Sequence, residues 1–195
     1  AEQLAAVTDE AIRRWASAVG DQAAASLSAV NWELADLPGN LLGLASANTV
    51  RIDRDAGGRG WFVDASPWDD EEFLASRAAD ELRARRGGAA ADRVDLLTAV
   101  MHELGHVLGY GHTDDGQGLM SPVLSAGGSR AEAAEGIGAE AAQPLGRAEW
   151  RSGLDFPRAS DALFADLADD GPAGVWRSGD LRTDRLEYVP DITVD

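Results

Sequence analysis

Three histidines stand in one short stretch, His102, His106 and His112, and the chain contains no other histidine. His102 and His106 are four residues apart, so on a helix both rings project from the same face and can bind one metal ion. Gly109 can adopt the left-handed backbone that ends a helix, and the chain would then turn back and bring His112 to the same ion. Three imidazoles leave the fourth position of a zinc ion open to water, which is typical of catalytic zinc. The spacing therefore predicts one catalytic zinc ion.

Glu103 directly follows the first histidine, so its carboxylate is expected to reach the water on the zinc ion rather than the metal itself. There it can take a proton as the water attacks, which is the role of a general base. An apolar helix that carries two histidines by chance is the alternative, but chance does not explain the full run His-Glu-x-x-His-x-x-Gly-x-x-His. We therefore predict Glu103 as the catalytic residue.

This run resembles the signature of the metzincin zinc endopeptidases, in which a turn bearing a methionine follows the third histidine. Met120 follows His112 by eight residues and precedes a Ser-Pro pair, and this spacing resembles the matrixin branch of the family. The resemblance implies that Met120 forms an apolar floor beneath the metal. It covers roughly residues 1–125 and is strongest from Asp95 to Pro122.

The resemblance also implies a fold and a mode of substrate binding. The fold would be an α+β, zincin-like metzincin catalytic domain: a twisted, mostly parallel sheet with an antiparallel edge strand, a backing helix and an active-site helix. Gly43, Leu44 and Ala45 would lie on the edge strand and bind a protein or peptide substrate as an added strand. No histidine remains for the second, structural zinc ion of vertebrate matrixins, so none is expected.

Several carboxylates near a glycine-rich turn make calcium a second candidate ion, because hard cations favour oxygen ligands. The same acidic loops can equally be solvated without an ion. The candidate ligands are Asp53, Asp55, Asp64, Asp69 and Asp70.

The composition excludes several classes of partner. The chain has 34 acidic and 17 basic residues and a net charge of −17, so we expect no binding to nucleic acid or anionic membranes. It has no cysteine, which excludes disulfides and thiolate zinc sites. No apolar run approaches the ~20 residues that a membrane helix needs, so no membrane insertion is expected.

The stretch from Trp61 to Asp64 resembles matrixin-like domains embedded in large bacterial surface or secreted proteins. This resemblance implies a secreted or cell-surface location, a bacterial origin and a place in a larger polypeptide. The first residues lack the basic start and apolar stretch of a signal peptide, so any export signal is expected to lie outside the 195 residues.

The apolar pattern predicts the elements that position the motif. Helical spacing from Leu4 to Val19 predicts an N-terminal helix that ends at Gly20. Strands are predicted from Val30 to Leu34 and from Thr49 to Asp53, and Trp61–Val63 fits either a third strand or a packed aromatic anchor. Asp95 is the predicted N-cap of the helix that carries the histidines.

The remaining segments allow less specific predictions. Asp69–Glu72 suits the start of a short helix, but the segment as far as Arg86 can equally be a surface loop. We place the catalytic domain in residues 1–125, an Ala/Gly/Glu-rich linker in 126–146 and an appendage in 147–195. Within the appendage, residues 159–167 fit a short amphipathic helix and 175–189 a loose hairpin.

The predicted function is that of a metalloendopeptidase that cleaves extended peptide segments. One alternative is a binding or adhesion module that keeps zinc for stability while residues 147–195 block the cleft. Another is a non-catalytic segment of a larger polypeptide. Cleavage of casein that vanishes in Glu103→Ala, with zinc content unchanged, separates the first function from the other two.

Overall fold

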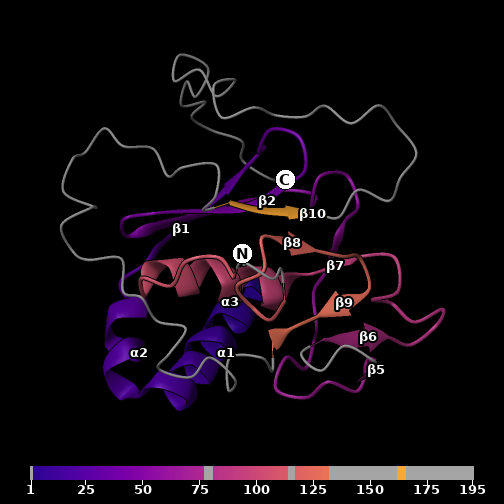
Figure 1. Ribbon diagram of the computed structural model, residues 1–195, viewed down its shortest axis with the longest axis horizontal. Helices are drawn as coiled ribbons and strands as arrows, with labels where there is room; N and C mark the ends of the chain where they lie inside the picture. Colours follow the sequence, from indigo (N-terminus) through magenta and orange to yellow (C-terminus); the bar gives the residue numbers. More distant parts are fainter. Residues whose placement is uncertain (1, 77–80, 114–116, 132–161, 166–195) are drawn as a thin grey trace.

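A computed structural model describes residues 2–76, 81–113, 117–131 and 162–165 of the chain. Within these residues the helices are α1 (Glu2–Val19), α2 (Asp21–Leu27) and α3 (Leu96–Val107). Figure 1 shows α3 in the middle of the molecule, with the largest sheet on one side and the α1–α2 pair on the other. The α+β class is therefore confirmed.

The largest sheet has the strand order β1-β3-β2-β10-β8. Its strands are β1 (Asn31–Ala35), β2 (Leu41–Ser46), β3 (Thr49–Asp53), β8 (Val123–Leu124) and β10 (Ala162–Ala165). β1 is parallel to β3 and β10 to β8, whereas β2 is antiparallel to both of its neighbours. The described sheet is thus mixed rather than mostly parallel. A short turn at Ala47 and Asn48 joins β2 to β3, and a turn of this length can connect only antiparallel strands.

Two small sheets complete the described structure. β4 (Trp61–Phe62) is parallel to β7 (Val94–Asp95), and β6 (Leu82–Ala84) lies between β5 (Phe73–Ala75) and β9 (Gly128–Ser129). The helix considered after Asp69 is therefore wrong, because β5 and β6 occupy that segment. Phe73 is buried there against Phe62, with ring centroids 5.7 Å apart, so tertiary packing outweighs the local acidic pattern.

Most other predicted elements within the described residues are confirmed. These are the helix α1 and the strands β1 and β3, and of the two alternatives for Trp61–Val63 the structure has the strand, β4. The helix suggested for residues 159–167 is wrong in its described part, where β10 is a strand. β9 falls within the predicted linker, the rest of which, from 132 onward, lies outside the described residues, as does the hairpin suggested for 175–189.

Helix α3 is buried along most of its length, because α1 and the main sheet both pack on it. Trp15 of α1 is fully buried and donates its indole N–H to the Met101 carbonyl of α3 over 2.9 Å. Asp95 caps α3, since its carboxylate accepts hydrogen bonds from the backbone N–H groups of Leu97 and Thr98. The predicted N-cap is confirmed, and the helix that carries two of the histidines packs against both α1 and the main sheet.

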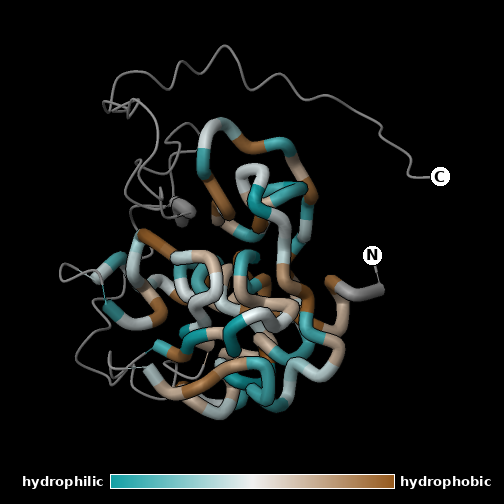
Figure 2. Tube along the Cα trace, turned by 90° about the vertical axis from the view of Figure 1, so that its right-hand side faces the viewer, coloured by the Kyte–Doolittle hydropathy of each residue, from teal (hydrophilic) through white to brown (hydrophobic). Residues whose placement is uncertain are grey.

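Hydrophobic and hydrophilic residues are interspersed along the described chain (Figure 2). Among the described residues no helix has the length and apolar character that crossing a membrane requires.

Asp53, at the end of β3, organises the turn that follows it. Its side chain is buried and accepts hydrogen bonds from the backbone N–H groups of Leu37, Asp55 and Gly57, at 2.8, 3.1 and 2.9 Å. Burial alone would raise the pKa of Asp53, but these three donors lower it overall. The ionised carboxylate is therefore part of the fold.

Asp53→Ala is expected to lower the free energy of unfolding at pH 7 by about 2–4 kcal/mol, because buried N–H groups would lose a charged acceptor. Folding lowers the pKa of Asp53. The stabilisation that its carboxylate provides is therefore fully present above the unfolded pKa of about 3.9, and it is lost as the pH falls through the lower pKa of the folded state. Urea unfolding at pH 7 and pH 3 measures it. Asp36→Ala, at an exposed position, is the control, and an equal loss in both variants would contradict the assignment.

Candidate metal centre

The structure brings His102, His106 and His112 together. Their Nε2 atoms lie 3.0 Å apart for His102 and His106, 3.1 Å for His102 and His112, and 3.2 Å for His106 and His112. Among the described residues, these three form the group whose ligand atoms could hold a metal ion. The first two histidines are buried on α3, and the third is partly buried in the segment after it.

Backbone carbonyls fix which ring nitrogens face the centre. His102 Nδ1 lies 2.9 Å from the Leu119 carbonyl and His106 Nδ1 lies 2.8 Å from the Tyr110 carbonyl. A carbonyl oxygen can only accept, so in both rings Nδ1 carries the hydrogen and donates it. In the neutral rings, Nε2 then presents a lone pair toward the other histidines.

This arrangement fits a zinc ion. Lone pairs facing one another at about 3 Å repel unless a cation lies among them. Zn–N bonds of ~2.0–2.1 Å in tetrahedral geometry place two nitrogens about 3.3 Å apart, close to the separations seen here. Hydrogen bonds from the outer ring nitrogens to carbonyls are also the usual way in which histidine ligands of zinc are oriented.

His102 and His112 are neutral at pH 7 even before a metal binds. Burial, aided by the neighbouring His106, lowers the pKa of His112 to about 4. Burial, again with His106, also lowers the pKa of His102 well below its ordinary value. Neutral imidazole is the form that binds zinc, so the fold favours ligation over protonation.

Gly109 lies at the turn that brings His112 back. Helix α3 ends at Val107, and Gly109 has a φ of 93°, in the region that favours glycine. Tyr110 N donates to the Gly105 carbonyl over 3.0 Å, which closes the end of the helix. The chain reverses here and returns His112 to the face of α3 that carries the other two histidines.

Met120 lies beneath the histidine-bearing helix and is 3 % exposed. A Cβ built on Gly105 would overlap the Met120 sulfur and would lie 3.1 Å from Cζ2 of Trp15. A residue larger than the glycine between the two helical histidines would therefore force the Met120 side chain to shift. Trp15 also stacks on Tyr110, with ring centroids 5.3 Å apart, so α1 supports the segment whose carbonyl holds His106.

Gly105→Ala is expected to destabilise the protein by about 1–3 kcal/mol, because the added methyl overpacks the space below the helix. Helix propensity alone predicts the opposite sign, a gain of about 1 kcal/mol for Gly→Ala. Denaturant unfolding of Gly105→Ala, Met120→Ala and the double variant measures the coupling. If the double variant lost as much free energy of unfolding as the two single variants together, the contact between positions 105 and 120 would be contradicted.

Glu103 is fully buried and lies directly against β2. A Cβ built on Gly43 would lie 2.5 Å from Glu103 Oε1 and 2.7 Å from its Cγ. Any larger residue at position 43 would therefore displace the carboxylate. The structure thus brings the predicted edge-strand residue Gly43 next to the predicted base.

Leu44 and Ala45 continue β2 beyond Gly43, and both edges of this strand are paired. Gly43, Leu44 and Ala45 face Ile52, Arg51 and Val50 of β3. On the other edge, Gly43 and Leu44 face Leu163 and Ala162 of β10. The strand predicted to take a peptide thus already has a strand of the same chain in the position of that peptide.

Sequence reasoning missed three supports of this centre. The Leu119 and Tyr110 carbonyls orient two histidines, and Trp15 packs under the helix from nearly ninety positions away. A backbone acceptor has no signature in residue types. The apolar spacing of α1 placed Trp15 on a buried face but did not indicate what it contacts.

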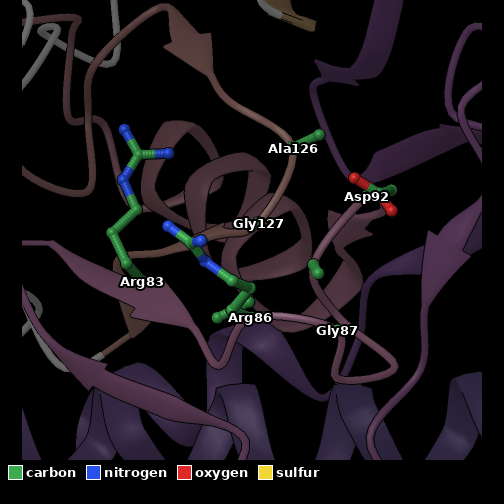
Figure 3. Close-up of a pocket in the computed structure, with 8 residues that line it drawn as sticks. Arg83, Arg86, Gly87, Asp92, Ala126 and Gly127 are labelled. Atoms are coloured by element: carbon green, nitrogen blue, oxygen red, sulfur yellow. The ribbon is translucent and has the colours of Figure 1, made fainter.

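A separate hollow of about 430 Å³ opens beside β6 (Figure 3). Arg83, Arg86 and Asp92 are among its lining residues. Arg83 pairs with Glu81 over 2.6 Å. None of the predicted site residues lines this hollow.

Comparison with known proteins agrees with the site. A buried helix with two histidines, a glycine turn, a third histidine and a methionine beneath them define a metallopeptidase-type centre. The matrixin family model matches residues 27–135, more than half of the chain, and the protein belongs to this family of peptidases. No curated protein and no solved structure matches the chain.

Proposed function

We propose that the protein is a zinc-dependent endopeptidase that hydrolyses peptide bonds in extended segments. His102, His106 and His112 are the zinc ligands, and Glu103 is the general base. The observation that carries this proposal is the convergence of three Nε2 atoms within 3.2 Å, with two rings locked by carbonyls in the tautomer that binds metal.

A zinc ion held by His102, His106 and His112 would supply an activated water and a Lewis acid that polarises the scissile carbonyl. Glu103 sits one residue from the first ligand, buried against Gly43, where a carboxylate can take the proton of the attacking water and pass it to the leaving nitrogen. Backbone groups of β2 hold the substrate beside this carboxylate as an added strand. The experiment that tests the proposal is cleavage of an unfolded protein such as casein, with and without a zinc chelator.

A zinc-stabilised binding module that does not hydrolyse peptides is the second candidate. The observation that favours it is the pairing of β2 with β10, which fills the edge that a substrate would use. Retention of zinc without any cleavage of casein, even after β10 is displaced, would establish this candidate.

We also propose a calcium ion in the acidic loop from Asp64 to Glu72. Asp53 is excluded from this role because backbone donors already occupy its carboxylate. One oxygen of Glu72 is buried without a hydrogen-bond partner among the described residues. Burial, with the negative charges of Asp64 and Asp69, raises the pKa of Glu72. A bound cation would give the buried oxygen of Glu72 a partner and would offset the negative charges around it.

Calcium is therefore expected to raise the midpoint of thermal unfolding. At a free calcium concentration a hundred times the dissociation constant, the free energy of unfolding should increase by about 2.7 kcal/mol. Calorimetry with and without calcium measures the shift, with magnesium as the ionic control. Glu72→Gln should lose the shift. An equal shift in this variant, or with magnesium, would contradict a site in this loop.

The secreted or cell-surface location remains a proposal, as do the bacterial origin and the larger parent polypeptide. Membership in the matrixin family supports the location, because matrixin-like peptidases are often extracellular. Recovery of the chain from culture medium, rather than from cells, tests it.

A further inference from the structure

We propose that β10, residues Ala162–Ala165, is an internal occupant of the protein's own peptide-binding slot and competes with other peptides for it. The inference rests on the proposed function and concerns the regulation of the same site. β10 lies between β2 and β8 in the main sheet, as Figure 1 shows. No other described strand separates these two.

Both neighbours of β10 belong to the candidate active site. β2 contains Gly43, which abuts Glu103, and β8 begins three residues after Met120. β10 runs antiparallel to β2 and parallel to β8, so its backbone lies between the strand beside Glu103 and the strand that follows Met120. A peptide bound as an added strand to β2 would need this same position.

The register places β10 opposite the predicted base. Leu163 pairs with Gly43, and the pairing is irregular between Leu163 and Phe164. Since Gly43 is the residue of β2 in contact with Glu103, the backbone around Leu163 is the part of β10 nearest to the base. The occupant therefore spans the catalytic position rather than a remote end of the strand.

Occupation by β10 excludes a second peptide. A strand has two edges, and the other edge of β2 is paired with β3 from Gly43 to Ser46. A tethered segment also competes at an effective concentration that reaches about the millimolar range for linked binding elements. Free peptides at micromolar concentration would bind only in the fraction of molecules from which β10 has left.

The test replaces Leu163 and Phe164 with proline in the full chain. β10 is a central strand, where proline removes a ladder hydrogen bond and fixes a φ that the pairing does not tolerate. The matched control replaces the same two residues with alanine, which keeps both backbone N–H groups. Zinc content and circular dichroism verify that the centre and the fold are retained.

Hydrogen exchange of the β2 amides, Leu41–Ser46, is the first readout. The amides that face β10 should exchange at least about tenfold faster in the proline variant and at the wild-type rate in the alanine variant. A synthetic peptide with the sequence of residues 158–169, added to the proline variant, should restore the protection, and a scrambled peptide should not. Unchanged exchange in the proline variant, or no effect of the peptide, would overturn the proposal.

Hydrolysis of an unfolded protein is the second readout. If β10 fills the slot in nine molecules of ten, the proline variant should cleave about tenfold faster at low substrate concentration. The two proposals then fail separately. Faster exchange with no cleavage in any variant contradicts the endopeptidase but leaves β10 as the occupant, whereas equal cleavage with unchanged exchange contradicts only the occupant.

Discussion

Glu103→Gln is expected to lower kcat/KM for peptide hydrolysis by about 10²–10⁴-fold, the usual contribution of a general base. Glutamine has nearly the size of glutamate, so the contact with Gly43 and the buried helix α3 should be retained. Zinc content should stay near one per chain, because the carboxylate is not a ligand in this proposal. Initial rates on a fluorogenic peptide, with metal analysis of the same sample, measure both quantities.

Glu33→Gln is the matched control for this variant, because it makes the same chemical change at an exposed position. Its rate should equal that of the wild type. If Glu103→Gln retained wild-type activity, a different group would have to take the proton. If it lost its zinc, the loss of activity would have a different cause from the one proposed.

His112→Ala is expected to weaken zinc binding by more than about 100-fold and to abolish hydrolysis. Mutation of a residue that only hydrogen-bonds to a zinc ligand already lowers metal affinity or activity by about 10–100-fold, and loss of a ligand should cost more. His112 is partly exposed and lies outside α3, so the helix and its two histidines should remain folded. Competition for zinc with a chromophoric chelator measures the change in affinity.

Gly111→Ala is the control for the removal of His112. A Cβ at Gly111 would meet no atom within 4 Å, so the adjacent substitution should leave zinc affinity unchanged. Equal zinc affinity in His112→Ala and wild type would show that the third histidine is not a ligand.

The parts of the fold that depend on local patterns could be predicted from the sequence. The helical spacing of apolar residues gave α1, the Asp95 cap gave the start of α3, and alternation gave β3 with its observed bounds. The histidine cluster was predicted for the same reason, because four-residue spacing and one glycine determine where the rings point. These features need only neighbouring residues.

The other parts depend on contacts between distant segments. Phe73 becomes part of a strand because it packs on Phe62, and an acidic run before it suggested a helix instead. The close contacts at Gly43 and Gly105 are made by Glu103 and Met120, which approach from other elements. β10 pairs with a strand more than a hundred residues earlier, and a four-residue strand carries too little pattern to reveal its partner.

A zinc titration of metal-free protein, with bound zinc and peptide hydrolysis measured in the same samples, tests the proposed endopeptidase. Wild type, Glu103→Gln and the Leu163/Phe164 proline variant are titrated in parallel. We expect hydrolysis to rise in proportion to bound zinc up to one ion per chain, to be fastest in the proline variant and to be at least about 100-fold slower in Glu103→Gln at the same zinc content. Hydrolysis by the metal-free protein, or full zinc binding without hydrolysis in the proline variant, would contradict the proposal.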